Sequence, residues 1–181
     1  NRMIRKIQGM PLARHFEVFP LFGEMSLKDQ DRAIEFAGRR KIIVSTNIAE
    51  TSLTVDGVSL IIDTGMAKKA SFDPTRGINV LLSQPICKSS ADQRAGRAGR
   101  TSDGYCLRLW TSAEHQRKEE FEPPEISRLD LAELYLNILS IDERPDSLVW
   151  FDELPESSLE RASATLTSLG AIEDNGIISS R

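Results

Sequence analysis

The chain has 181 residues, of which 40% are hydrophobic and 28% charged, which suits a folded globular protein and excludes collagen-like and wholly disordered chains. The net charge of −4 argues against a general polyanion-coating protein, and the two cysteines, Cys87 and Cys106, form no CxxC pair or Cys/His cluster that would indicate a disulfide framework or a zinc site. The longest apolar stretch, near residues 58–62, is too short for a membrane span of about 20 residues, and without a secretory signal we expect a cytoplasmic protein.

The N-terminal half alternates predicted helices with predicted strands. Helical apolar spacing or a capping serine marks the helices, and β-branched or aromatic runs mark the strands. The predicted helices cover residues 3–12 and a segment from the N-cap Ser26 to Gly38, and the predicted strands cover residues 17–22, 41–45 and 58–63. Strands that are apolar on both faces and separated by helices are typical of a buried parallel sheet, so the sequence predicts an α/β fold.

The second half begins with a predicted β-hairpin, in which residues 69–72 and 78–82 flank a turn rich in proline and glycine. A helix capped by Ser89 or Ser90 is then expected to run through a cluster of arginines. The remaining predicted elements are a strand over 105–110, helices over 129–139 and 159–169, the second ended by Gly170, and a small hairpin over 171–179 with Asn175-Gly176 at its tip.

Charge is unevenly distributed along the chain. Residues 119–160 hold thirteen acidic and two basic residues, whereas residues 88–108 hold four arginines against two aspartates. A concentrated cationic stretch in an acidic protein indicates either a specific anionic ligand or a solvated, salt-bridged face.

The sharpest feature of the cationic stretch is the run QRAGRAGR at residues 93–100. If the run is helical, Arg97 and Arg100 lie on one face, with Arg94 a turn earlier. Its two glycines would each weaken a helix by about 1 kcal/mol relative to alanine, which indicates that a backbone or a phosphate comes close. The rigid fork of arginine suits a transferring phosphoryl group, and Gln93 can orient a water. The alternatives are a disordered Arg/Gly-rich RNA-binding tract and an ordinary basic surface helix.

A second run, STNIAETSLT at residues 45–54, directly follows the predicted strand 41–45. Its hydroxyls and amide therefore lie at the carboxyl end of a sheet, where open α/β sheets bind ligands. Short neutral donors there can hold the phosphate oxygens of a nucleic-acid strand without reading its bases. A capped turn rich in serine and threonine is the alternative interpretation.

Together these runs resemble the DEAH-box helicases of superfamily 2, a family of RNA-dependent NTPases. Residues 46–54 match the family's motif V (TNIAETSLT), residues 93–100 match its motif VI (QRAGRAGR), and residues 19–23 (FPLFG) look like motif IV with the loop behind it. The likeness covers residues 15–140, and the turn FDPTRG at residues 72–77 is more like the bacterial branch.

The resemblance implies a second RecA-like domain: a parallel sheet flanked by helices with a β-hairpin insertion, followed by a truncated helical and winged-helix segment. We place the RecA-like domain at residues 1–124, with its first strand missing, and the helical linker with the start of the winged-helix domain at residues 125–181. For the tail from Pro155 onward, an amphipathic helix that packs on the main domain is the plainer alternative.

The resemblance also implies catalytic and nucleotide-binding roles. Gln93, Arg97 and Arg100 would face the terminal phosphates of ATP, the two arginines as fingers that stabilise transition-state charge and Gln93 as the residue that positions the attacking water. Ser52 and Asp56 would approach the nucleotide, with Asp56 toward the ribose.

The implied cofactor is ATP with Mg²⁺, held mainly by a first RecA-like domain, and no metal ligands are expected in this chain. Met66 belongs to the implied nucleotide-binding set, although many members place there an aromatic that stacks on the base. The sequence contains neither a GxxxxGK[ST] loop nor a DEAH tetrapeptide, both of which cradle phosphates and metal, so the chain alone is expected not to hydrolyse ATP.

The implied RNA-binding residues are Gly23, Thr46, Asn47 and Thr51, which would contact the RNA backbone, while the hairpin at residues 65–82 would act as a wedge. The sequence therefore predicts the C-terminal RecA-like half of an ATP-dependent RNA helicase or translocase. The expected partners are single-stranded RNA and the first RecA-like domain of the same protein, with no membrane.

Two other functions are the alternatives to the helicase. One is a non-enzymatic RNA-binding or partner-docking module with this fold, and the other is a DNA-directed or viral superfamily 2 helicase. Gln93 beside two arginines favours the enzyme, because a binding module needs charge but has no need to position a water.

Overall fold

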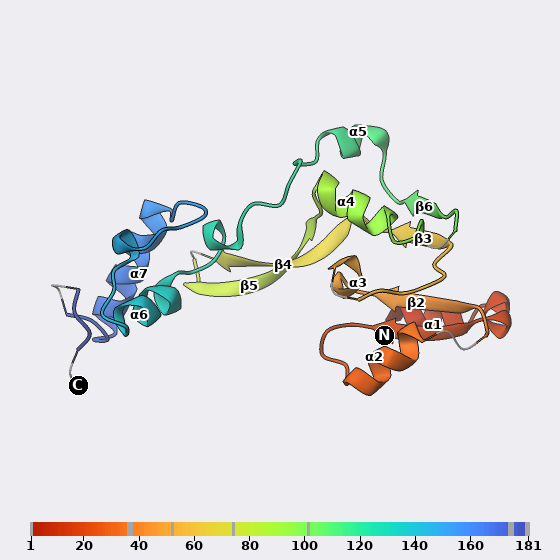
Figure 1. Cartoon of the computed structure of the whole chain (residues 1–181), viewed down its shortest axis with the longest axis horizontal. Helices are drawn as coiled ribbons and strands as arrows, with labels where there is room; N and C mark the ends of the chain where they lie inside the picture. Colours follow the sequence, from red (N-terminus) through yellow and green to blue (C-terminus); the bar gives the residue numbers. More distant parts are fainter. Residues whose placement is uncertain are drawn as a thin grey trace. The chain divides into compact units, whose positions relative to one another are not determined.

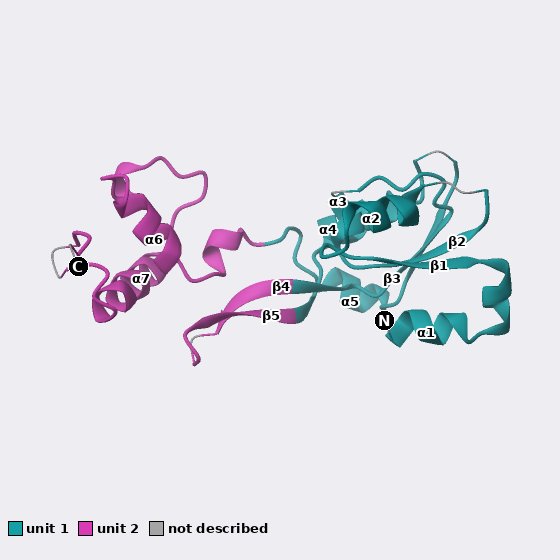
Figure 2. Cartoon of the chain, turned by 90° about the horizontal axis from the view of Figure 1, so that it is seen from below, with its two compact units in different colours: residues 1–68, 83–122 teal, residues 69–82, 123–181 magenta. Residues whose placement is uncertain are grey.

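The computed structural model describes residues 2–35, 38–51, 53–73, 75–100, 102–173 and 176–179. The chain divides into two compact units (Figure 2). Unit 1 comprises residues 1–68 and 83–122, and unit 2 comprises residues 69–82 and 123–181.

Unit 1 alternates helices and strands in the order expected of an α/β fold (Figure 1). Its elements are α1 (Arg2–Gln8), the 3-10 helix η1 (Pro11–His15), β1 (Glu17–Leu21), α2 (Leu27–Ile34), β2 (Lys41–Ser45), α3 (Ile48–Thr51), β3 (Leu60–Asp63), α4 (Lys88–Ala95), β6 (Tyr105–Arg108) and α5 (Ser112–Gln116). A hairpin of β4 (Met66–Asp73) and β5 (Ile78–Pro85) has residues in both units. The mixed α/β class is confirmed.

The predicted parallel strand pairing is present as two separate pairs. In one, β1 pairs with β2 from Glu17 opposite Lys41 to Leu21 opposite Ser45; in the other, β3 pairs with β6. Parallel strands bring their carboxyl ends to the same edge, so the segments after β1 and β2 start side by side. Leu21 is fully buried at that edge and anchors it.

The predicted N-cap of α2 is confirmed, but α2 ends at Ile34 and not at Gly38, and two other predicted helices also end earlier than expected. The Ser26 side chain accepts a hydrogen bond from the backbone N–H of Asp29. The first helix ends at Gln8, because a turn leads into Pro11, which has no N–H to continue the helix and instead starts η1. The helix expected to run through the arginine cluster, α4, ends at Ala95.

The predicted burial of residues 58–63 on both faces is wrong. Leu60 and Ile62 of β3 are more than half exposed, and so are their register partners Tyr105 and Leu107 of β6. These four side chains share one face because successive side chains of a strand alternate between faces. Apolar character alone does not decide burial, since much of a folded protein's surface is apolar.

Unit 2 is built around two helices that pack together, α6 (Ala132–Leu139) and α7 (Glu156–Ser168), with the 3-10 helices η2 (Glu125–Ser127) and η3 (Pro145–Ser147). The buried residues Ile138, Ala162 and Leu166 form its core. As predicted, α7 stops just before Gly170.

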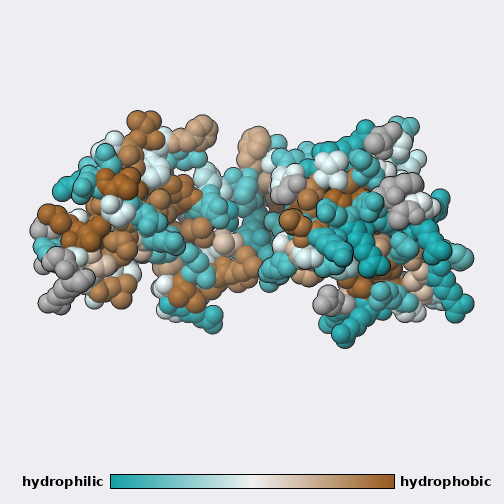
Figure 3. Space-filling model, turned by 60° about the horizontal axis from the view of Figure 1, so that its bottom comes forward, coloured by the Kyte–Doolittle hydropathy of each residue, from teal (hydrophilic) through white to brown (hydrophobic). Residues whose placement is uncertain are grey.

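The small C-terminal hairpin predicted for unit 2 is reduced to one antiparallel bridge between Ile172 and Ile178, and the predicted tip residue Asn175 lies outside the described residues. Hydrophobic side chains are widespread on the face of unit 2 seen in Figure 3. In the same unit, Val149 and Phe151 are fully exposed. In the described part of the chain, none of the helices is both long and apolar enough to cross a membrane.

Candidate functional site

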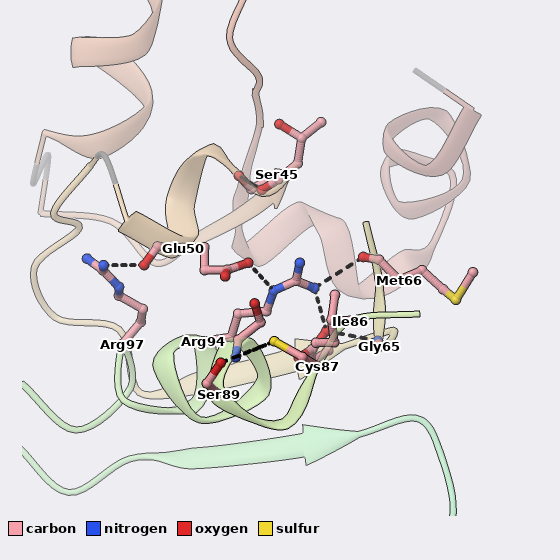
Figure 4. A network of polar contacts seen from close by, with 12 residues as sticks. Ser45, Glu50, Gly65, Met66, Ile86, Cys87, Ser89, Arg94 and Arg97 are labelled. Atoms are coloured by element: carbon pink, nitrogen blue, oxygen red, sulfur yellow. Dashed lines mark hydrogen bonds and ion pairs between the residues drawn. The ribbon is translucent and has the colours of Figure 1, made fainter. Parts of the chain in front are cut away.

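The two sequence runs singled out above lie against each other in unit 1. Arg97 donates from Nη1 to the backbone oxygen of Leu53 (3.1 Å) and from Nη2 to the backbone oxygen of Glu50. Arg100 donates from Nη1 to Oγ1 of Thr54 (3.0 Å). The α3 segment and the turn after α4 therefore form one site, although the residues in contact are more than forty positions apart (Figure 4).

The second and third arginines lie on a turn, not on the helix face that periodicity indicated. Gly96 caps α4, and the N–H groups of Arg97 and Ala98 bond to carbonyls three residues back. Gly104 packs on this turn so closely that a Cβ there would collide with the backbone carbonyl of Ala98. The two arginines therefore extend from a tightly held backbone, and Gly104 makes the close approach possible.

Arg94 makes a different set of contacts from the arginines that follow it. Its Nε donates to Oε2 of Glu50 (2.9 Å), and its Nη1 donates to Oδ1 of Asp63 (3.0 Å) and to the backbone oxygen of Met66 (3.2 Å). The Arg94 and Glu50 side chains are each 14% exposed and that of Asp63 is 2% exposed. Asp63 Oδ1 also accepts the N–H of Gly65 (2.9 Å), so the guanidinium joins α3 to the turn between β3 and β4.

The sequence prediction missed Glu50 and Asp63 as site residues. One signal was available for Asp63, because a carboxylate that ends an apolar strand needs a partner if it is buried. Glu50 has a weaker signal: it is the one charged residue in the run at 45–54.

Arg97 and Arg100 leave their charges uncompensated. In the described part of the chain, both guanidinium groups bond only to neutral oxygens, and neither forms an ion pair. Gln93 is exposed on the last turns of α4. Guanidinium groups that keep spare donors and full charge are suited to a phosphate, so these residues fit the triphosphate of a nucleotide.

A second group of predicted residues gathers at the carboxyl ends of β1 and β2. Thr46 and Asn47 directly follow β2, and the N–H of Thr46 bonds to the backbone oxygen of Leu21 at the end of β1 (3.0 Å). Gly23 follows β1 in an exposed loop, and the buried Gln30 of α2 holds that loop through the backbone oxygen of Met25, which lies 3.1 Å from Nε2. Gly23, Thr46 and Asn47 are exposed, as is Thr51 at the end of α3.

Three further residues were predicted to bind the nucleotide. The Met66 side chain is 41% exposed, and its backbone oxygen is held by Arg94. Asp56 is exposed in the loop between α3 and β3. Ser52 lies outside the described residues. Among the described residues, no group of three or more His, Cys, Asp or Glu is placed to hold a metal ion.

Cys87 supports the site from the start of α4. Its Sγ accepts the N–H of Ser90 (3.4 Å) and lies 3.1 Å from the hydroxyl oxygen of Ser89, so Cys87 is the N-cap that we assigned to one of these serines. Burial raises the pKa of the Cys87 thiol, but the hydrogen bonds of Ser89 and Ser90 together outweigh it and leave the pKa below its usual value. In β6, burial raises the pKa of the Cys106 thiol.

Comparison with known proteins assigns this site to a family. Residues 2–102 match the family described as the helicase conserved C-terminal domain. The ATP-dependent RNA helicase DHX33 of Mus musculus is 40% identical over 161 residues, which are 86% of this chain and 23% of that protein. The ATP-dependent RNA helicase HrpB of Escherichia coli is 40% identical over 157 residues, 85% of this chain and 19% of that protein.

Similarity extends to the three-dimensional structure. The crystal structure of the Escherichia coli DEAH/RHA helicase HrpB matches with a TM-score of 0.88 at 35% identity, over 99% of this chain and 24% of that one. The chain spans no more than a quarter of the length of these relatives. The family match takes in more than half of the chain and both runs of the site. The chain therefore belongs to the helicase conserved C-terminal domain family, as a member related to the DEAH-box RNA helicases.

Proposed function

We propose that this chain is the second RecA-like domain of an ATP-dependent RNA helicase or translocase. In this role it supplies arginine fingers to ATP hydrolysis and backbone contacts to single-stranded RNA. The observation that carries the proposal is the contact between the two runs, in which Arg97 and Arg100 extend from a fixed turn and, among the described residues, bond only to neutral oxygens. Such guanidinium groups can turn to a phosphate without first leaving a carboxylate.

On the nucleotide side, Arg97 and Arg100 would stabilise the charge that develops on the terminal phosphate, and Gln93 would orient the attacking water. Asp56 and Ser52 would approach the nucleotide, with Asp56 at the ribose. ATP with Mg²⁺ would be held mainly by a first RecA-like domain of the same protein, which would supply the phosphate-cradling loop and the metal-binding acid.

Met66 would lie near the base of the nucleotide. A methionine fills an irregular apolar gap but lacks the flat face that an aromatic residue offers for stacking, so base preference would be weak.

On the nucleic-acid side, the exposed group at the ends of β1 and β2 would hold the RNA backbone. Thr46, Asn47, Thr51 and the backbone at Gly23 offer neutral donors and acceptors, which suit phosphate and sugar oxygens and read no sequence. Closure of the two RecA-like domains on ATP would assemble the fingers, and reopening after hydrolysis would move this group along the strand. The hairpin at residues 65–82 would act as the wedge, and residues 125–181 would begin a winged-helix domain.

The decisive experiment is RNA-stimulated ATP hydrolysis by the whole protein, comparing wild type with Arg97→Ala. Loss of a finger is expected to lower kcat by about 10³-fold or more while ATP and RNA still bind. Arg161→Ala is the matched control, because Arg161 lies in unit 2, where it donates to the hydroxyl of Ser158 and stacks on Phe72. Unchanged hydrolysis in Arg97→Ala would contradict the finger role and favour a non-enzymatic RNA-binding or docking module.

A further inference from the structure

The guanidinium of Arg94 joins the helix that follows β2 to the turn that follows β3. Its bonds to Glu50, Asp63 and the backbone oxygen of Met66 are all 2.9–3.2 Å long (Figure 4). Three donor–acceptor pairs from one planar group fix both the position and the orientation of what they hold, which an ammonium group cannot do.

The network around Arg94 carries one positive and two negative charges in a nearly dry place. Within the described part of the chain, Oδ2 of Asp63 and Nη2 of Arg94 are buried without a hydrogen-bond partner. A buried triad with a net negative charge contributes little to stability, because desolvation offsets much of the Coulombic gain. Its main effect is to fix geometry, which points to a role in positioning.

Glu50 links this network to the second arginine of the run. Its carboxylate binds Arg94, and its backbone oxygen accepts from Nη2 of Arg97. Any displacement of α3 therefore moves an acceptor of Arg97 as well. The segment that would displace α3 is its own flank, where Asn47 precedes the helix and Thr51 ends it.

We propose that Arg94 is a positioning residue that couples RNA binding at residues 46–51 to the placement of Arg97. RNA that binds beside α3 shifts or holds this helix, and the ion pairs of Arg94 keep α3 in register with α4, so Arg97 is presented to the nucleotide when RNA is bound. This inference rests on the proposed function, and it assigns to Arg94 the regulation of that site.

The test measures the ratio of kcat with saturating RNA to kcat without RNA in the whole protein. Arg94→Lys keeps the charge but loses the fork, and it is expected to lower this ratio about tenfold, since coupling between two sites is typically worth about 5–150-fold. The RNA-free kcat and the KM for ATP are expected to stay within about twofold of wild type, because Arg94 is not among the residues that we place at ATP or RNA.

A second variant, Glu50→Ala, removes the carboxylate and keeps the backbone oxygen that binds Arg97. It leaves Arg94 and Asp63 as a balanced pair, so the melting temperature is expected to fall by no more than about 4 °C while the RNA stimulation falls about tenfold. In the double variant, the RNA stimulation is expected to be no lower than in the more strongly affected single variant, because both changes break the same link. Should Arg94→Lys fail to fold, Glu50→Ala carries the test alone.

Binding provides a readout that does not depend on turnover. Linkage requires that a non-hydrolysable ATP analogue change the RNA affinity by the same factor by which RNA changes the affinity for the analogue. We expect the change in RNA Kd on adding the analogue to shrink in both variants. Arg108→Lys is the control: Arg108 pairs with Asp92 of α4 at 2.6 Å but forms no hydrogen bond or ion pair with a described residue of the run at 45–54, and it is expected to retain the wild-type coupling.

The outcomes separate this inference from the proposed function. If wild type shows no RNA-stimulated hydrolysis, or Arg97→Ala retains it, the proposed function fails and this inference fails with it. If Arg97→Ala abolishes hydrolysis while Arg94→Lys and Glu50→Ala keep the wild-type ratio, only the coupling role of Arg94 is overturned. If Arg94 only stabilised the fold, Arg94→Lys would lower kcat with RNA and kcat without RNA by the same factor. The ratio of the two would then stay at its wild-type value, which would also overturn the coupling role.

Discussion

Arg94 and the pair Arg97 and Arg100 stand within seven residues of one another, and the structure uses their guanidinium groups in opposite ways. Arg94 is largely buried and bonded to two carboxylates, whereas Arg97 and Arg100 bond to backbone carbonyls and a hydroxyl. The first arrangement neutralises the positive charge inside the protein, and the second leaves it paired with neutral groups, which is the state that the proposed phosphate contact needs. A run of similar residues can therefore place an internal ion-pair network beside arginines bonded to neutral groups.

The largest expected difference between these regions is in stability. Arg94→Met would leave Glu50 and Asp63 buried without their cation, which is expected to lower the free energy of unfolding by about 3–5 kcal/mol. Arg97→Met removes only hydrogen bonds to neutral carbonyls and is expected to cost about 1–2 kcal/mol. Denaturant unfolding of both variants, followed by circular dichroism, measures the two changes.

The triple variant Arg94→Met, Glu50→Gln, Asp63→Asn is the control for the charge argument. Removing both carboxylates with their cation is expected to recover part of the stability, because no uncompensated buried charge remains. If Arg94→Met and Arg97→Met lose equal amounts of stability, the distinction between an arginine paired with carboxylates and one bonded to neutral groups does not hold.

A smaller effect on stability is expected from substituting a glycine in the turn or loop next to each region. Gly65 lies in the turn held by Arg94, has a φ of +71°, and would place a Cβ 2.7 Å from the ring of Trp110. Gly57 lies in the loop beyond Leu53, whose carbonyl holds Arg97, has a φ of +72° and has nothing within 4 Å of its Cβ position.

Alanine at these two glycines separates backbone strain from crowding. Gly57→Ala is expected to cost about 1–2 kcal/mol, since only the left-handed conformation opposes it. Gly65→Ala is expected to cost about 1–3 kcal/mol more, because the Trp110 ring must also move. Thermal unfolding of both variants gives the difference, and equal losses would show that the turn beneath Arg94 is as open as the loop beneath Arg97.

The sequence was sufficient to predict the order of the strands and of most helices and to single out the two runs that meet in the site, but it did not predict the short helices α3 and α5. Parallel pairing followed from apolar strands separated by helices, and the α2 N-cap followed from Ser26. These features depend on local pattern and short-range chemistry, which a sequence displays directly.

The different contacts of Arg94 and of the two later arginines could not be predicted, because they depend on partners that are distant in the chain. Glu50 lies 44 positions and Asp63 lies 31 positions from Arg94. Helical spacing placed all three arginines on one helix, but α4 ends at Ala95 and is capped by Gly96, and where a helix ends depends on tertiary packing as well as on spacing. Burial of β3 was likewise overestimated, since apolar residues do not reveal what covers them.

The smallest expected effect concerns Arg100, whose partner is the exposed hydroxyl of Thr54. Thr54→Val keeps the shape of the side chain and removes the acceptor, and it is expected to change the free energy of unfolding by no more than about 0.5 kcal/mol, because Arg100 is exposed and water can replace the hydroxyl. Thr54→Ser, which keeps the acceptor, is the matched control, and denaturant unfolding compares the two. A loss as large as that of Arg94→Met would group Arg100 with the ion-paired Arg94, since its charge would then be held by the protein and not kept for a phosphate.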